Sequence, residues 1–326
     1  MRADQINYRL QINNGAAGRK YSFSYASTRM ISVTVGRTGA VISADLTKDY
    51  SDDLDDPYIS NLLKEAVRRA ALIYVIRYER PFHVRDIRLA VSDKDRILKE
   101  VDLSDSLIFY QLFENKLLRP VGADLKDPAV LQSVMKYRRS KDDLVRPVSA
   151  LYAYLFSKTK KKETERFTYL WIAMNGFYAA VTHVSHDRDQ MTAFVKKFGL
   201  GNVTLTRNDR DNVCRLGMSR ISKLPEPVTA ESLERSEGSI LSDFLDQTRV
   251  KLGKEKFDLT PYGFLLTDFP YYLRCTHFHA QRLIELFSFD NDIELKSLRI
   301  VNGLLEEFLD RNIHILFRNM EIPPFK

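Results

Sequence analysis

The spacing of apolar residues changes once along this chain, and this change limits the possible folds more than any other feature. Over residues 1–122, short segments alternate apolar and polar side chains, which is typical of half-buried β-strands. Over residues 123–326, apolar residues recur about every 3.6 positions, as on one side of an α-helix. The length of 326 residues also exceeds what one hydrophobic core usually covers. We therefore expect an α+β protein in which a small N-terminal α+β domain precedes an all-α domain.

The N-terminal domain, residues 1–122, is predicted to contain a sheet and one long helix. Pro57 follows a run of aspartates and Pro81 follows an amphipathic stripe, so the helix is expected between these prolines. Gly36 and Gly39 indicate the turn of a β-hairpin. The expected strands are Tyr8–Ile12, Tyr21–Tyr25, Met30–Val35, Ala40–Ala44, Val84–Val91 and Ser106–Phe113.

The C-terminal domain, residues 123–326, is predicted to consist of helices joined by polar connections. The lysine-rich segment Ser157–Glu165 and residues 200–228 are expected to be loops. The expected helices are Pro128–Tyr137, Asp142–Phe156, Arg166–Val184, Met191–Phe198, Ser239–Leu252, Pro270–Leu286 and Ile293–Phe317.

The composition excludes several classes of protein. With 44% hydrophobic and 29% charged residues, the chain is neither disordered nor fibrous in character. Two cysteines, Cys214 and Cys275, cannot form a disulfide framework, so we expect a reducing compartment, the cytoplasm. No apolar run approaches the roughly 20 residues of a membrane span, and the first residues lack the apolar core of a signal peptide. The net charge of +7 admits a nucleic-acid partner.

Motifs for the commonest cofactor chemistries are absent from the sequence. The chain contains no GxxxxGK[ST] phosphate loop, no GxGxxG dinucleotide turn, no GxSxG elbow and no HExxH zinc helix. The two cysteines are too far apart in sequence for a CxxC metal site. We therefore expect no metal and no other cofactor.

Arginine and histidine cluster in the segment LRCTHFHAQR, where Arg274 and Arg282 flank His277 and His279. Imidazoles titrate near neutral pH and serve as base and acid, while an arginine can hold a phosphate with two hydrogen bonds and stabilise transition-state charge. The cluster therefore suits cleavage of an RNA phosphodiester without a metal. In the alternative interpretation, these histidines pack or cap a helix start and the arginines face solvent.

A second arginine with a histidine downstream, Arg77 and His83, spans Pro81. At this proline a helix is expected to give way to a strand, so we interpret the pair as the surface end of a helix. The pattern alone therefore does not single out a catalytic site, and the helical context distinguishes Arg274 and His279.

Two segments resemble the Apea-like branch of the HEPN domain family. LRCTHFHAQ resembles that branch's RCNxFHG-type signature, and RFTYLWIAMNGFY, residues 166–178, resembles its FxxLWxAFNxLY signature. The segments also occur in the family's order. The matching positions are Phe167, Leu170, Trp171, Ala173, Asn175, Tyr178, Arg274, Cys275, Phe278 and His279.

The resemblance, which covers about residues 142–317, implies an antiparallel helical bundle that acts as a metal-independent endoribonuclease. It also implies a homodimer in which the Arg–His motifs of two protomers form one composite site. Arg274 would bind the scissile phosphate and His279 would act as acid or base. The implied partners are RNA, a second copy of the chain and a regulatory partner or antitoxin. The implied role is a toxin or antiviral-defence effector, with residues 1–122 as a sensor or regulator.

Helix geometry and two departures from the signature extend the set of candidate residues. Positions five apart lie about 140° from each other around a straight helix, whereas Arg274 and His277, three apart, are neighbours, so His277 is a second candidate for the acid or base. Thr276 replaces the signature's Asn but keeps a hydroxyl, and Ala280 replaces its Gly. These departures permit a non-catalytic module that binds RNA, dimerises or acts as an adaptor.

The remaining candidates are supporting residues. Asn175 is either a buried, hydrogen-bonded residue of the bundle or a group that orients a catalytic side chain. Arg282 and the lysines Lys160, Lys161 and Lys162 are candidates for holding the RNA backbone. The alternative for the lysines is an ordinary solvated loop.

Overall fold

The computed structural model divides the chain into two compact units. The sheet unit comprises Met1–Val148 together with Asp310–Pro324, and the helical unit comprises Ser149–Leu309. The sequence predicts a boundary near residue 122, whereas the sheet unit continues to Val148 and also includes the later segment Asp310–Pro324. The described residues are 5–13, 15, 17–24, 30–47, 57–83, 85–93, 96–103, 119–136, 146–182, 184, 187–198, 266–267, 270–271, 274 and 292–318.

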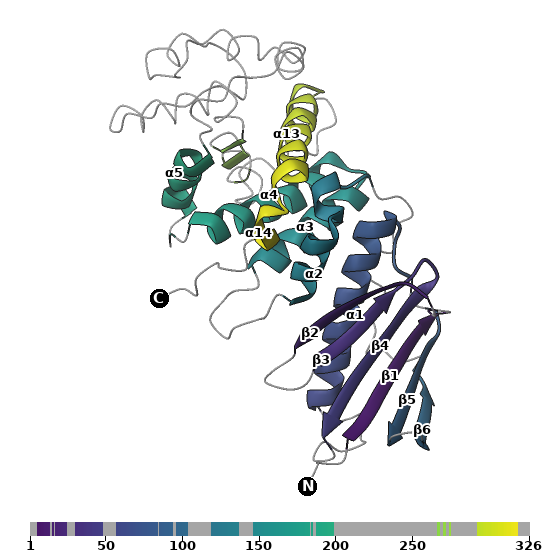
Figure 1. Ribbon diagram of the computed structural model, residues 1–326. Coiled ribbons are helices and arrows are strands. Elements are labelled where there is room, and N and C mark those ends of the chain that lie inside the picture. The colour runs from purple at the N-terminus through teal and green to yellow at the C-terminus, as the bar shows by residue number, and fades with distance from the viewer. Residues whose placement is uncertain are drawn as a thin grey trace, which may run out of the picture. The chain divides into compact units, whose positions relative to one another are not determined.

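The sheet unit contains a six-stranded antiparallel sheet with the order β2-β3-β4-β1-β5-β6 (Figure 1). A row of buried residues crosses the sheet because the apolar positions of neighbouring strands are in register. Each residue of the row pairs with the next one on the neighbouring strand, in the order Tyr21, Val33, Ile42, Leu10 and Leu89. The strands are β1 (Gln5–Asn13), β2 (Arg19–Ser24), β3 (Met30–Val35), β4 (Gly39–Thr47), β5 (Ile87–Asp93) and β6 (Arg96–Asp102).

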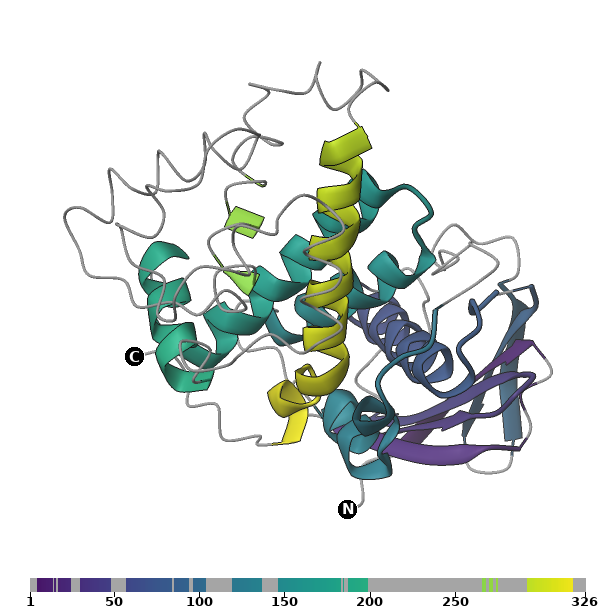
Figure 2. The same cartoon turned by 90° about the horizontal axis from the view of Figure 1, so that it is seen from above.

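Helix α1 (Pro57–Tyr78) lies against one face of this sheet (Figures 1 and 2). The predicted helix between Pro57 and Pro81 is therefore confirmed. Its buried surface is wider than the expected stripe, because α2 (Pro128–Lys136) also packs on it and Arg69 donates to the carbonyl of Met135.

Helix α1 ends in a left-handed residue. Glu79 has φ 52° and its N–H donates to the carbonyl of Val75 at 2.8 Å, a common helix C-terminal arrangement. The Glu79 carboxylate then accepts from the Val121 N–H at 2.9 Å and pairs with Lys126 at 2.6 Å. One acidic side chain thus fastens the end of α1 to the segment that contains the short helix η1 (Ala123–Lys126).

The predicted hairpin and five of the six predicted strands are present, and one strand, β6, was missed. The turn between β3 and β4 closes with the Gly36 N–H on the Gly39 carbonyl at 2.9 Å, and a Cβ at Gly39 would collide with the Ile12 carbonyl. Strand β6 lacks apolar alternation because it is an edge strand that is exposed on both sides, with Ile97 63% exposed. The predicted strand Ser106–Phe113 lies outside the described residues.

The helical unit is built from α3 (Arg146–Thr159), α4 (Glu163–Thr182), α5 (Asp187–Phe198) and most of α13 (Asp292–Asn312). Four phenylalanines from α4, α5 and α13 meet in its interior, with ring centroids 4.8 to 6.0 Å apart. They are Phe177, Phe194, Phe198 and Phe308. The α+β class is therefore observed.

The predicted loop Ser157–Glu165 is wrong at both of its ends. Helix α3 continues to Thr159 and α4 begins at Glu163, so that only three residues connect the two helices. The lysines misled the prediction, because Lys158 is only 1% exposed and its charge is satisfied inside the unit by Glu306.

The last predicted helix, Ile293–Phe317, is divided. Helix α13 ends at Asn312, and a turn at Ile313 and His314 separates it from α14 (Ile315–Arg318). The predicted helix Ser239–Leu252 and most of Pro270–Leu286 lie outside the described residues. Within the part of the chain that the structure describes, no helix combines the length and apolar character needed to cross a bilayer.

Candidate active site around Arg274

Arg274 contacts an aromatic side chain that belongs to its own helical turn. Its guanidinium carbon lies 6.0 Å from the centroid of the Tyr271 ring, at the outer limit of a cation–π contact. Pro270, Tyr271 and Arg274 have helical backbone, and the Tyr271 N–H donates to the Thr267 carbonyl at 3.1 Å. Three positions separate Tyr271 and Arg274, so the helix presents both on one side.

Tyr271 in turn packs against helix α4. The centroids of the Tyr271 and Trp171 rings are 6.1 Å apart, with an angle of 59° between the rings. Figure 2 shows the short green stretches of residues 266–267, 270–271 and 274 beside the teal helix α4. Trp171 is buried and also contacts Tyr178 at 6.2 Å, edge to face. Tyr271, three positions before Arg274, therefore packs against the Trp171 side of α4.

Asn175 shares the face of α4 that Tyr271 covers. It follows Trp171 by four positions, which places it about 40° further around the helix. Its side chain is half-buried, so it is more exposed than the buried residue of the bundle that was one of the two interpretations from the sequence. The chain of contacts from Arg274 through Tyr271 to Trp171 thus leads to the side of α4 that carries Asn175.

The other proposed catalytic residues lie outside the described residues. These are His277, His279 and Thr276, together with Arg282. Their roles remain predictions from the sequence.

The three lysines have different surroundings. Lys160 lies 3.9 Å from the Glu165 carboxylate and 5.0 Å from the Tyr169 ring centroid, whereas Lys161 and Lys162 are exposed. Tyr169 and Trp171 are two positions apart, or about 200° around α4. Lys160 therefore contacts a different side of α4 from the side that Tyr271 covers.

The structure also shows a buried charged cluster that the sequence interpretation missed. Lys158 of α3 pairs with Glu306 of α13 at 2.7 Å, and Arg166 of α4 pairs with the other oxygen of the same carboxylate. Arg166 also lies 3.4 Å from Glu163. The Asn302 amide donates to the Glu163 carbonyl at 2.9 Å and to its carboxylate at 2.8 Å. The cluster joins three helices through complementary charges.

A sequence signal for this cluster exists in the helical period. Lys158 follows Leu151 by seven positions and Leu155 by three, so it extends the apolar stripe of α3 and faces inward. On α13, Asn302 and Glu306 are four apart and border the buried stripe that contains Val301 and Leu305. A charged residue in register with an apolar stripe thus indicates a buried partner of opposite charge.

Comparison with known proteins leaves the family open. No family model, curated protein or solved structure matches the chain. Among the described residues, no three His, Cys, Asp or Glu side chains converge in a way that could hold a metal ion.

Proposed function

We propose that this protein is a HEPN-like, metal-independent endoribonuclease that acts as a homodimer. The observation that supports it best is a chain of contacts through Tyr271 that links Arg274 to Trp171, one residue from each signature: Arg274 lies over Tyr271, and Tyr271 packs on Trp171. An arginine held on an aromatic ring keeps its planar guanidinium oriented for a phosphate, because the ring limits its rotation. The proposal assigns the scissile phosphate to Arg274.

The proposed reaction is an internal transesterification. A histidine, His279 or His277, accepts the proton of the ribose 2′-hydroxyl, and the 2′-oxygen attacks the adjacent phosphorus. The bond from phosphorus to the 5′-oxygen breaks, and a second protonated group donates a proton to that oxygen. The products end in a 2′,3′-cyclic phosphate and a 5′-hydroxyl, and Arg274 stabilises the added negative charge on the phosphoryl oxygens.

A composite site agrees with helix geometry. Arg274 and His279 lie about 140° apart on a straight helix, so one protomer does not direct both toward the same point. In a dimer, the arginine of one protomer and the histidine of its partner can converge on one phosphate. Asn175, on the side of α4 nearest this contact, is proposed to orient one of these side chains.

The second candidate function is RNA binding or dimerisation without cleavage. It is favoured by Thr276 and Ala280, which replace the Asn and Gly of the signature. Alanine at position 280 disfavours the positive φ that the glycine of the signature can adopt. This candidate predicts affinity for RNA that falls steeply with salt, and no strand cleavage.

The test compares cleavage of a single-stranded RNA in EDTA by the wild type and by Arg274→Ala and His279→Ala. We expect each variant to be about 100- to 10,000-fold slower, the usual contribution of an acid–base or charge-stabilising group. Arg299→Ala is the matched control, because Arg299 is an exposed arginine of the same unit whose guanidinium lies 3.9 Å from Glu163. Fluorescence of Trp171 verifies folding beside the site.

Two results would decide against the nuclease. Cleavage by both variants at the wild-type rate would show that Arg274 and His279 are not catalytic residues. RNA binding without any cleavage by the wild type would favour the second candidate.

A further inference from the structure

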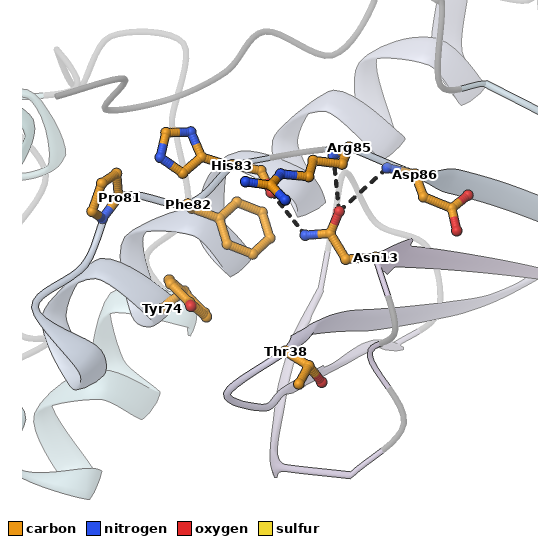
Figure 3. Close-up of a pocket in the computed structure, with 8 residues that line it drawn as sticks. All are labelled: Asn13, Thr38, Tyr74, Pro81, Phe82, His83, Arg85 and Asp86. Atoms are coloured by element: carbon orange, nitrogen blue, oxygen red, sulfur yellow. Dashed lines mark hydrogen bonds between the residues drawn. The ribbon is translucent and has the colours of Figure 1, made fainter. Parts of the chain in front are cut away.

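The sheet unit contains a pocket whose lining includes none of the residues proposed for catalysis. It has a volume of about 390 Å³ and lies between the end of α1, the turn joining β3 to β4, and the segment that precedes β5 (Figure 3). Ligand pockets usually measure about 300 to 1,000 Å³, so this one suits a small molecule. His83, which the sequence interpretation left at a surface helix end, is part of its lining.

One asparagine organises the wall of the pocket. The Asn13 side chain donates to the His83 carbonyl at 2.7 Å and accepts from the N–H groups of Arg85 at 2.8 Å and Asp86 at 3.3 Å. Its own N–H donates to the Asp86 carbonyl at 2.6 Å. Figure 3 shows these bonds converging on Asn13 from the segment above it.

The backbone of Asn13 is itself unusual. Its φ is 52°, in the left-handed region that few residues other than glycine enter, although asparagine tolerates it. Such conformations persist where the surroundings fix them, and they concentrate at functional sites. The irregular segment around His83 and Arg85 is therefore held in place before any ligand arrives.

The opposite wall is aromatic. The rings of Tyr74 and Phe82 lie 4.9 Å apart between centroids, with an angle of 54° between them. Phe82 is buried and Tyr74 is partly exposed, and the Tyr74 hydroxyl donates to the Arg37 carbonyl at 3.1 Å. This bond fixes the Tyr74 ring against the hairpin turn that carries Thr38, so the ring offers a rigid apolar surface.

The charges around the pocket favour an anion. Arg85 is exposed and His83 is half-buried, and in Figure 3 the guanidinium of Arg85 extends toward His83 above Phe82. Asp86 is the acidic residue of the lining, but its carboxylate lies 3.4 Å from Arg88 and points away from Phe82 in Figure 3. A cationic side and an aromatic side thus face the same space.

We propose that this pocket binds a nucleoside monophosphate, with the base against Tyr74 and the phosphate at Arg85 and His83. Bases stack on aromatic rings whatever their sequence, and arginine binds phosphate through two parallel hydrogen bonds. Arg85 and His83 together offer several N–H donors, which suit the three oxygens of a phosphate ligand better than the two oxygens of a carboxylate ligand. The size of the pocket accommodates one nucleotide and not a longer chain. This proposal does not depend on the proposed nuclease activity.

The test is calorimetric titration of the full-length protein with AMP, GMP, CMP and UMP, and separately with the four nucleosides and with inorganic phosphate. We expect at least one monophosphate to saturate the protein, and its nucleoside and inorganic phosphate to bind at least about tenfold more weakly. Arg85→Ala should weaken the monophosphate by about tenfold and leave the nucleoside unchanged. The matched control is Arg96→Ala, another exposed arginine of the unit, which lies on β6 and should bind as the wild type does.

A second variant tests the role of Asn13. Asn13→Gly keeps the left-handed backbone accessible while it removes the carboxamide bonds, so binding should weaken in a protein whose circular dichroism is unchanged. The proposal is overturned if no monophosphate binds at about 1 mM, if inorganic phosphate binds as tightly as the nucleotides, or if Arg85→Ala binds as the wild type does.

Discussion

An apolar row in the sheet unit and a charged cluster in the helical unit are both buried, but they hold their neighbouring elements together by different chemistry. Across the sheet unit, Leu10, Val33 and Ile42 are completely buried in an apolar row. In the helical unit, Lys158 is equally inaccessible, yet it is charged and paired with Glu306. The comparison shows that depth in the interior does not determine whether an apolar contact or an ion pair holds neighbouring elements together.

This difference governs how each unit responds to the loss of one side chain. An apolar deletion leaves a cavity, and the neighbours keep their favourable contacts with one another. Deletion of one charge leaves its partners buried without compensation, which costs more than the pair contributed. We therefore expect the larger single effects in the helical unit.

The largest effect is expected for Glu306→Gln. The substitution preserves shape but leaves Lys158 and Arg166 facing a neutral amide, so we expect a loss of about 3 to 5 kcal/mol in the free energy of unfolding. Trp171 is the single tryptophan of the chain and is buried in the helical unit. Its fluorescence during urea denaturation therefore reports on this unit.

A combined variant sharpens the interpretation of the cluster. Lys158→Met, Arg166→Met and Glu306→Leu together replace the charges with apolar groups of similar volume, and such replacements are often neutral or stabilising. We expect the triple variant to recover most of the stability lost in Glu306→Gln. A triple variant less stable than the single one would show that the ion pairs themselves stabilise the unit.

The next largest effect is expected for Leu10→Ala in the sheet unit. Leu10 lies between Ile42 and Leu89 in the register of the sheet, and its removal should cost about 2 to 5 kcal/mol. Hydrogen exchange measured by mass spectrometry should then speed up in β1, β4 and β5. Arg9→Ala, one position earlier and on the exposed side of β1, is the control and should change stability by less than about 0.5 kcal/mol. Equal effects of the two substitutions would contradict the apolar row as the core.

A smaller, pH-dependent effect is expected from His314. Burial lowers the pKa of this imidazole below its usual 6.5, and the charge of Arg318 lowers it further, while Asp124 and Asp127 act in the opposite direction. The unfolded chain therefore binds a proton at a higher pH than the folded protein does. Stability should be fully present above the unfolded pKa and should fall as the pH drops below it toward the lower folded pKa, by at most about 1.4 kcal/mol per pH unit.

Thermal unfolding between pH 5 and pH 7.5 would measure this contribution (a range chosen about the unperturbed histidine pKa). His314→Gln should flatten the decline in melting temperature toward acid pH. A variant with the same slope as the wild type would assign the decline to other groups.

The smallest effect is expected for Glu165→Gln. Its carboxylate is 47% exposed and lies 3.9 Å from Lys160, so the pair is a surface interaction worth about 0 to 1 kcal/mol. The free energy of unfolding of Glu165→Gln and of Glu306→Gln is measured by Trp171 fluorescence during urea denaturation. The two variants then compare an exposed glutamate with a buried glutamate of the same unit. Similar losses in both variants would contradict the comparison between buried and exposed charges.

The sequence predicted the sheet unit well where burial is one-sided. The alternation in Tyr8–Ile12 and Met30–Val35 is produced by one buried and one exposed face, so the pattern and the register follow from the same cause. Strand β6 could not be predicted this way, because both faces of this edge strand are exposed. Strand β6 pairs with β5 through backbone hydrogen bonds, which the pattern of side chains does not reveal.

Contacts between distant polar residues were the part that local patterns could not predict. Lys158 and Glu306 are 148 positions apart, and Asn13 bonds to a segment about 70 positions away. The helical period of α3 could have indicated that Lys158 is buried, but the local sequence does not identify Glu306 or His83 as the partner of Lys158 or Asn13. The contact between Tyr271 and Trp171 was not predicted, because it joins two segments with no shared periodicity.

The most direct test of the proposed function is the chemistry of the RNA ends. Cleavage by the wild-type protein in EDTA should leave 2′,3′-cyclic phosphates and 5′-hydroxyls, since the 2′-oxygen is the proposed nucleophile. These ends should disappear in Arg274→Ala and His279→Ala and persist in Arg299→Ala. Products that carry 5′-phosphates, or cleavage that EDTA abolishes, would contradict the proposed mechanism.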